Sequence, residues 1–331
     1  LSVSGVSFVN LSDSNQVSVF PYGGELTVNQ NRDFSFDGVV ETGRFALYGK
    51  NINFVYDSFK LAFNNIDSLQ FAVPSDLYDN TGSPVDWAVN TVISDLVGTL
   101  SIDAPNNKSG LKDYPEFPKL KSIKDSYIYY DNIKDGVYER DLFSFKVDSF
   151  QFDSLLIIDT YSLEFPGYLN APSIFPLFRD TLTLNEDLEL SFIHEIKNKY
   201  PVYQGKGFFT NKLNLNNSGL SGEGTIYYLN SVTETDSVYF YPNQVLANAN
   251  KYDISKQITP SNIPKISVSN ANIDWRPYLD EMKSSNRVEL FECYQDNYDF
   301  DGSIILSPYD LSASGEFYYD NALFASDYFV F

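Results

Sequence analysis

The sequence predicts an all-β protein with an extended, repetitive antiparallel architecture and few short helices. Three observations support this prediction: strand-like alternation along most of the chain, a composition rich in aromatic residues, and an internal repeat near the C-terminus. A β-solenoid, a β-groove and a stacked sandwich are all compatible with these observations.

Alternation of apolar and polar residues with a period of two is the first observation. The segment FSFDGVV places Phe34, Phe36 and Gly38 on one side of a strand. In LFSFKVDSFQF the residues from Phe143 to Val147 alternate, and the pattern resumes out of step at Phe150. Roughly twenty such segments, bounded by Gly, Asn, Asp and Pro, are typical of strands.

Composition is the second observation. The 331 residues are 43% hydrophobic and 16% aromatic, with 25 Tyr and 27 Phe. Aromatic and β-branched side chains favour pleated, half-buried surfaces, so this composition favours strands over helices. The length is sufficient for one large domain or two ordinary ones with hydrophobic cores.

The third observation is a repeat with a period of 91 residues (294 − 203 = 91). Residues 203–240, the first copy, align without a gap on residues 294–331, the second copy. Twelve of the 38 aligned positions are identical, against about two or three expected by chance for ordinary composition. A repeat of this kind predicts β units that gain stability by stacking on their neighbours.

Helical periodicity is rare. The best candidate is residues 83–100, where Pro84 suits a first helical turn and Trp87, Val92 and Leu96 share a stripe. We therefore predict an N-terminal β region over residues 1–110 with one short helix near 84–98. Residues 111–331 form the repeat-containing β region, and the loop-like stretch 103–120 marks the boundary. Residues 74–80 are predicted to form a turn, and one or two helical turns are expected after Pro277.

The net charge of −21 limits the partners. Such an acidic chain repels phosphate backbones, so no nucleic acid is expected, and anionic lipid surfaces are disfavoured. The composition suits either simple solubility outside the cytoplasm or the binding of divalent cations. The chain contains no run of eighteen apolar residues, so no transmembrane helix is expected.

The residues that usually carry chemistry are scarce. Cys293 is the only cysteine and His194 the only histidine, so an internal disulfide and a cysteine-based metal site are excluded. Cys293 stands in an alternating apolar segment and is predicted to be a buried strand thiol rather than a nucleophile. The 44 acidic residues include no pair singled out by spacing for glycoside hydrolysis.

A glycine-rich stretch, SGLSGEGTIYYL at residues 218–229, has the appearance of a phosphate-binding or nucleophile loop. Its spacing does not fit G-x-x-x-x-G-K-[ST], G-x-G-x-x-G or G-x-S-x-G, and a strand-like segment follows it. In the second copy the stretch becomes YDLSASGEFYYD, in which only the glycine equivalent to Gly224 persists. We therefore predict a structural turn or bulge.

A weak calcium candidate lies in NYDFDG at residues 297–302. Asn297, Asp299 and Asp301 alternate before Gly302, like the first half of a calcium-binding loop. The twelfth position is Pro308 instead of glutamate, so an EF-hand is excluded. An Asp-Gly turn, as in residues 33–38 and 131–136, is the alternative explanation. The expected cofactor is none, with calcium as the alternative.

Several segments resemble parts of a known group of proteins. The blocks SYIYYDNIKDGVYERDLFSFKVDSFQFDSLL, FPGYLNAPSIFPLFRDTLTL, YPVYQGKGFFTNKLNLNNSGLSGEG and SGEFYYDNALFASDYFVF look like parts of very large, β-rich cell-envelope proteins of Bacteroidota. The motif Asp-Ser/Thr-apolar, for example at residues 67–69, is similar to an O-glycosylation signal of exported Bacteroidota proteins. The glycine and aromatic rhythm is also similar, at fold level, to elongated β-groove proteins that carry lipid or lipopolysaccharide across the periplasm.

The resemblance implies an extracytoplasmic location, in the periplasm or at the outer membrane or cell surface of a Gram-negative bacterium. We expect a non-enzymatic scaffold segment of a large envelope protein that presents a β surface to other envelope proteins or to the rest of a larger polypeptide. The first residue, Leu1, and the strand-like end DYFVF fit such a segment. A periplasmic lipid-carrying groove and a glycan-binding or glycan-cleaving module are the alternatives.

Overall fold

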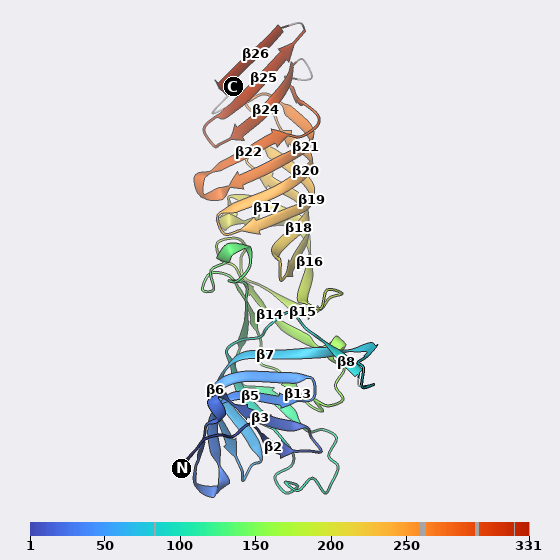
Figure 1. The fold of residues 1–331 in the computed structure, drawn as a ribbon. Coiled ribbons are helices and arrows are strands. Elements are labelled where there is room, and N and C mark those ends of the chain that lie inside the picture. The colour runs from blue at the N-terminus through green and yellow to red at the C-terminus, as the bar shows by residue number, and fades with distance from the viewer. Residues whose placement is uncertain (83, 259–262, 295–297, 321, 331) are drawn as a thin grey trace. The chain divides into compact units, whose positions relative to one another are not determined.

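The chain folds into two compact all-β units. The computed structural model describes residues 1–82, 84–258, 263–294, 298–320 and 322–330. Unit 1 comprises Leu1–Tyr130, Ser144–Leu169 and Phe178–Ser191, and unit 2 comprises Asp131–Phe143, Asn170–Leu177 and Phe192–Phe331. The all-β class is confirmed, because the strands form large antiparallel sheets and the six helical segments among the described residues are three-residue 3-10 turns (Figure 1).

Unit 1 is built on an antiparallel sheet with the strand order β1-β4-β5-β6-β7-β9-β10-β13, on which β3 also pairs with β5 and β2, and β8 pairs with β7. A second set, β11-β12-β14-β15, continues onto the first residues of β16. The strands are β1 (Ser2–Val3), β2 (Val9–Ser12), β3 (Val17–Pro21), β4 (Leu26–Val28), β5 (Phe34–Thr42), β6 (Phe45–Val55), β7 (Lys60–Tyr78), β8 (Pro84–Ala88), β9 (Leu96–Ser101), β10 (Lys119–Ser122), β11 (Ser126–Tyr129), β12 (Ser144–Val147), β13 (Gln151–Phe152), β14 (Glu164–Asn170), β15 (Phe178–Leu184) and β16 (Leu190–Val202).

The alternation predicted from the sequence is present in unit 1. In β5 the side predicted to be apolar, which carries Phe34, Phe36 and Gly38, is buried, while the intervening residues are more exposed. Phe145 and Val147 of β12 are likewise fully buried, as is Phe143, which belongs to unit 2. Apolar residues at alternate positions therefore place one face of these strands in the core.

The predicted helix near residues 84–98 is wrong. Residues Pro84–Ala88 form β8 and Leu96–Ser101 form β9, and Trp87 lies opposite Val73 of β7. The predicted turn at residues 74–80 is also wrong, because β7 continues to Tyr78 where β8 pairs with it. The helical turn expected after Pro277 exists as a single 3-10 turn, Pro277–Leu279. Residue 110, the predicted boundary, lies inside unit 1.

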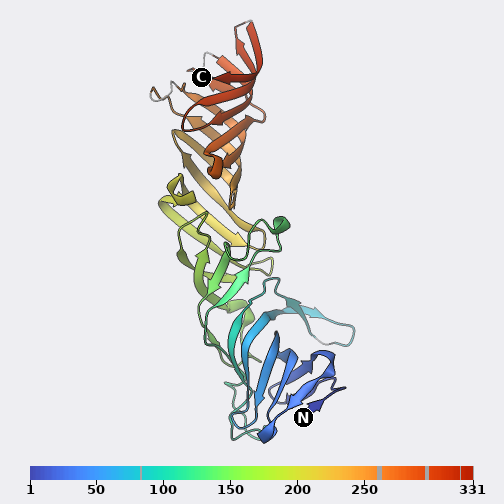
Figure 2. The same ribbon diagram turned by 90° about the vertical axis from the view of Figure 1, so that its left-hand side faces the viewer.

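Unit 2 is a succession of strands in which neighbours in the sequence are mostly neighbours in the sheet (Figure 1, Figure 2). Its strands after β16 are β17 (Gly207–Asn216), β18 (Gly219–Tyr228), β19 (Ser231–Tyr241), β20 (Gln244–Ile254), β21 (Ile266–Arg276), β22 (Glu281–Asn286), β23 (Phe291–Cys293), β24 (Tyr298–Leu306), β25 (Leu311–Tyr319) and β26 (Ala322–Val330). Both β22 and β23 pair with β21 on one side and β24 on the other.

The sheet of unit 2 curves around its own core. Trp275 on β21 is fully buried and its ring lies 5.1 Å from that of Tyr228 on β18, although two strands separate them in the sheet order. The Trp275 ring also lies 5.2 Å from that of Tyr203. Because side chains of strands that do not pair meet in this way, one face of the sheet forms the interior of the unit.

The sequence repeat is also a repeat of strand pairing. The second copy reproduces three strands of the first: β24, β25 and β26 begin 91 or 92 residues after β17, β18 and β19 (298 − 207 = 91, 311 − 219 = 92, 322 − 231 = 91). Leu215 pairs with Leu220 in the first copy, and their equivalents Leu306 and Leu311 pair in the second.

The irregularity in each copy is conserved as well. The ladder between β18 and β19 shifts register between Gly222 and Gly224, and the ladder between β25 and β26 shifts between Ala313 and Gly315. Gly224 and Gly315 both have a φ of 149°. The predicted turn or bulge is therefore a β-bulge, in which two residues of β19 or β26 oppose one residue of the neighbouring strand. The persistent glycine lies on that neighbouring strand, directly beside the bulge.

Candidate functional site

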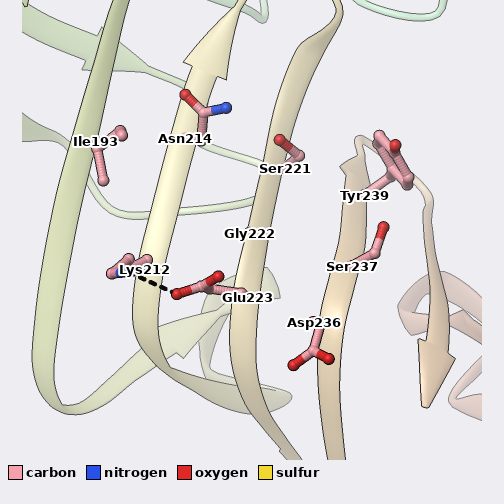
Figure 3. A pocket seen from close by; sticks show the side chains of 9 residues that line it. All are labelled: Ile193, Lys212, Asn214, Ser221, Gly222, Glu223, Asp236, Ser237 and Tyr239. Carbon is pink, nitrogen blue, oxygen red and sulfur yellow. Dashed lines mark ion pairs between the residues drawn. The ribbon is translucent and has the colours of Figure 1, made fainter. Parts of the chain in front are cut away.

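A shallow polar hollow of about 290 Å³ lies across four neighbouring strands of unit 2, β16 to β19. We call it the trough (Figure 3). Its lining residues, all labelled in Figure 3, are Ile193, Lys212, Asn214, Ser221, Gly222, Glu223, Asp236, Ser237 and Tyr239.

Strand register places these side chains next to one another. Ile193 pairs with Asn214, Asn214 pairs with Ser221, and Ser221 pairs with Tyr239, so these four residues form one row across the sheet. Their neighbours along the strands point to the opposite face: Leu213, for example, is fully buried. The same alternation that fills the core therefore assigns this row, three polar or hydroxyl-bearing residues and Ile193, to the outer face.

The bulge shapes the lower end of the trough. Because the β18–β19 ladder shifts register between Gly222 and Gly224, Glu223 has no direct partner on β19, and Asp236 and Ser237 of β19 lie near it. Gly222 lines the trough with its backbone, because it pairs with the buried Leu213 and Val238 and so belongs to the core-facing row of β18 (Figure 3). The Asp236 carboxylate accepts a hydrogen bond of 2.7 Å from the Asn250 amide on β20.

One ion pair crosses the trough. Lys212 Nζ lies 2.7 Å from Glu223 Oε1, and this hydrogen bond, together with the Glu223 charge, raises the pKa of Lys212. Both side chains are nearly half exposed, so the pair contributes little to stability. Its effect is to fix two charged groups beside a row of hydroxyl and amide groups.

The chemistry available in the trough is hydrogen bonding and ring contact. Asn214, Ser221 and Ser237 offer donors and acceptors, and Tyr239 is 37% exposed. Ile193, 68% exposed, adds an apolar rim. This combination suits recognition of a polar, extended ligand such as a polypeptide or a sugar.

Cys293 and His194 lie on different strands and have different partners. Cys293 is buried on β23 opposite Tyr298, and burial, with a smaller contribution from Asp299, raises the pKa of its thiol to about 12. His194 lies on β16 opposite Leu213. A thiol with so high a pKa is a poor nucleophile at neutral pH, which agrees with the interpretation of Cys293 as a buried strand thiol.

The calcium candidates lie in a strand. Asp299 and Asp301 are exposed on β24, and Asn297 lies outside the described residues. The Asp301 carboxylate accepts a hydrogen bond of 3.0 Å from the Asn286 side chain. Asp299 lies opposite Glu292 and lines a second hollow of about 510 Å³ with Glu289 and Glu292. Within the described ranges, no three His, Cys, Asp or Glu residues are placed to hold a metal ion together.

The glycine-rich stretch 218–229 is largely the strand β18, so a strand and not a helix follows its glycines. The phosphate-binding interpretation requires a helix N-terminus at this point. Instead, Ser221 and Gly222 line the trough as members of a strand.

Sequence reasoning did not identify the trough, although a signal for it exists. Its charged residues Lys212 and Glu223 are replaced in the second copy by the neutral Ser303 and Ser314, and Asn214 is replaced by Ile305. The ion pair and the Asn214 amide are therefore features of the first copy alone. The alignment of the two copies marks these three lining positions.

Comparison with protein-family models, curated proteins and solved structures finds no match for this chain. Its function is therefore inferred from its own geometry.

Proposed function

We propose that the chain is a non-enzymatic scaffold segment of a large bacterial cell-envelope protein, which presents the outer face of a repetitive sheet to other proteins. The observation that carries this proposal is the structural repeat of unit 2. Two copies share strand bounds, pairing register and a glycine bulge while their exposed side chains differ. Repeat proteins combine a constant framework with a variable surface in this way, and they use that surface for binding.

The envelope location rests on the resemblance to large Bacteroidota proteins and on the net charge of −21. A strongly acidic surface keeps a protein soluble and disfavours non-specific binding to nucleic acid. Among the described residues, no helix is long and apolar enough to span a membrane.

A non-enzymatic role is supported by the chemistry of the trough. Its charged residues Lys212 and Glu223 are paired with each other, and Asp236 is hydrogen-bonded to Asn250. The thiol of Cys293 is buried within the sheet. These arrangements favour binding over group transfer.

Glycan binding is the second candidate function. The exposed Tyr239 ring lies in a row with Asn214 and Ser221, and sugars bind to proteins through ring stacking combined with hydrogen bonds. A lipid-carrying groove has less support, because buried aromatic side chains such as Phe209, Phe240 and Trp275 occupy the interior of unit 2.

Site-specific photocrosslinking in cells tests the scaffold proposal. A photoreactive amino acid in place of Tyr239 should give adducts with a discrete envelope protein, and Glu223→Lys should reduce their yield. The same amino acid in place of Tyr278, which is 78% exposed outside the trough, is the matched control. Binding of the purified chain to an isolated polysaccharide, abolished by Tyr239→Ala, would instead favour the glycan function.

A further inference from the structure

A row of uncharged polar residues crosses the outer face of unit 2. Strand register places its members side by side on successive strands, from β19 to β25: Ser237, Asn248, Asn272, Ser285, Ser303 and Ser314. We call this set the amide–hydroxyl row. Neighbouring strands lie about 4.8 Å apart, so the five steps between the six strands make the row about 24 Å long.

The side chains of the row point away from the core. Asn272, for example, lies between Ala271 and Ile273, which are both buried. The two asparagines of the row are exposed, so their amide groups are accessible from outside. The hydroxyl oxygens of Ser285 and Ser303 lie 2.9 Å apart, which shows that side chains on adjacent strands of the row touch.

The row differs in charge from the outward-facing rows beside it. On one side Asp274 pairs with Lys283, and on the other Asp301 pairs with Glu316. Charged residues make up 20% of the chain, yet none stands in the row. Charged side chains would serve solubility equally well, and asparagine is depleted in strands. Solubility and strand propensity therefore do not account for the row.

The first member of the row lies in the trough. Ser237 lines the trough together with Tyr239, which stands two residues further along β19 (Figure 3). Tyr239 is partly exposed, so an aromatic side chain is available beside the beginning of the row. An extended ligand on the row would therefore have a hollow and an aromatic contact at one end.

The chemistry of the row matches that of a sugar. Hydroxyl and side-chain amide groups both donate and accept hydrogen bonds, as the hydroxyl groups of sugars do. Protein–protein interfaces are instead depleted in serine and depend on anchors such as Trp, Tyr and Arg. The net charge of −21 disfavours an anionic polymer. An uncharged glycan is therefore the occupant that the row fits best.

We propose that the amide–hydroxyl row binds an uncharged linear polysaccharide, which lies across the strands and reaches Tyr239 at one end. The inference rests on glycan binding, the second candidate function given above. It extends that function from the trough to a site about 24 Å long and names the class of glycan. Binding is through hydrogen bonds to sugar hydroxyls, with no covalent step.

Affinity electrophoresis of the whole chain tests the class of ligand. Native gels contain a mixed-linkage β-glucan, a xyloglucan, a mannan or, as the anionic comparison, alginate. At least one of the three uncharged polymers should retard the chain, and alginate should not. Retardation by alginate alone, or by none of the four polymers, would overturn the proposal.

Substitutions in the row test the site. Asn248→Ala and Asn272→Ala should each weaken binding by about fivefold, because each removes hydrogen bonds to the sugar. Asn272→Asp keeps the shape of the side chain but removes its donor, and should also weaken binding. Asn64→Ala, which removes an exposed asparagine from β7 of unit 1, is the matched control and should leave binding unchanged. Circular dichroism checks that each variant is folded.

The length of the bound glycan separates the row from the trough. Calorimetry with oligosaccharides of the polymer that binds should show affinity rising with chain length until the ligand spans about 24 Å. Affinity that stops rising with a ligand only long enough to fill the trough would overturn the proposal.

Two further results distinguish the row from the functions proposed above. Loss of retardation in Tyr239→Ala, with no change in the two asparagine variants, would confine the glycan to the trough and overturn the proposal while glycan binding stands. A photoreactive amino acid in place of Asn272 that captures a discrete protein, with no binding of any polymer, would also overturn it. Photocrosslinking at Tyr239 tests the scaffold role independently of these results.

Discussion

Gly224 and Gly315 hold the same strained position in the two copies. Each has a φ of 149°, a backbone angle that residues other than glycine rarely adopt. A Cβ at Gly224 would overlap the Thr210 carbonyl oxygen, and a Cβ at Gly315 would overlap the equivalent oxygen of Asp301. Both the backbone angle and the close approach of the neighbouring strand therefore require glycine.

Replacement of either glycine by alanine should destabilise the fold by about 3 kcal/mol, since backbone strain and steric overlap act together. Chemical denaturation measures this loss. Gly205→Ala is the matched control: its φ of 86° is also positive, but no atom lies within 4 Å of the added Cβ. An equal loss in the control would show that overlap with the neighbouring strand contributes nothing.

Cys293 should react with thiol reagents only after unfolding. The folded pKa of about 12 leaves almost no thiolate at pH 8, and the buried sulfur is shielded from the reagent. A colourimetric thiol assay should show slow labelling of the native chain and rapid labelling in denaturant. Rapid labelling of the native chain at pH 8 would contradict the burial of this strand.

At the scale of elements, strand pairing overrides local propensity. Residues 83–100 have a helical stripe, yet β8 pairs with β7, and Arg44 forms a 3.0 Å ion pair with Asp86 of β8. The alternation in β5 depends only on which face is buried, so the sequence predicted this strand correctly. The sequence did not predict the extension of β7 to Tyr78, because the extension depends on a partner strand that the local sequence does not specify.

Tyr138 connects the segment Asp131–Phe143 to two strands of unit 2. Its hydroxyl donates to the Phe240 carbonyl oxygen at 2.8 Å and accepts from the Leu220 N–H at 3.1 Å. The side chain is fully buried, so both backbone groups depend on this one hydroxyl.

Tyr138→Phe should reduce the free energy of unfolding by about 2 kcal/mol, because it leaves a buried donor and a buried acceptor without their partner. Equilibrium denaturation of the variant measures the effect. Tyr278→Phe, at a residue that is 78% exposed, should have no measurable effect. A loss in Tyr278→Phe as large as that in Tyr138→Phe would contradict the assignment.

At the scale of the whole molecule, buried tyrosines connect stability to alkaline pH. Burial is the main cause that raises the pKa of Tyr130, Tyr138, Tyr203, Tyr228 and Tyr252 above 10. In the unfolded chain these phenols lose their protons at lower pH than in the folded chain. The unfolded state then binds fewer protons, so stability falls as the pH rises.

We therefore expect stability to be insensitive to these phenols below about pH 9 and to fall progressively above about pH 10, with cooperative alkaline unfolding. Tyrosinate absorbance and circular dichroism followed together during a pH titration provide the measurement. Ionisation of all tyrosines while the native circular dichroism persists would contradict the burial of these rings.

The all-β class and the repeat were predictable at this scale because both depend on patterns that recur along the chain. The trough was not, because it depends on register: Asn214, Ser221 and Tyr239 are separated by up to 25 residues (239 − 214 = 25) and meet only when three strands pair. The sequence pattern defines which face each residue occupies, but the bulge at Gly222–Gly224 decides which residues become neighbours.

The alternation of faces also limits how such a chain changes length during evolution. A single-residue insertion within a strand exchanges the buried and exposed faces beyond it, unless a bulge absorbs the extra residue. An insertion or deletion of a complete 91-residue repeat leaves every face and every bulge in place (294 − 203 = 91). Relatives of this chain should therefore differ in length by whole repeats, with single-residue changes confined to hairpin turns such as Pro242–Asn243.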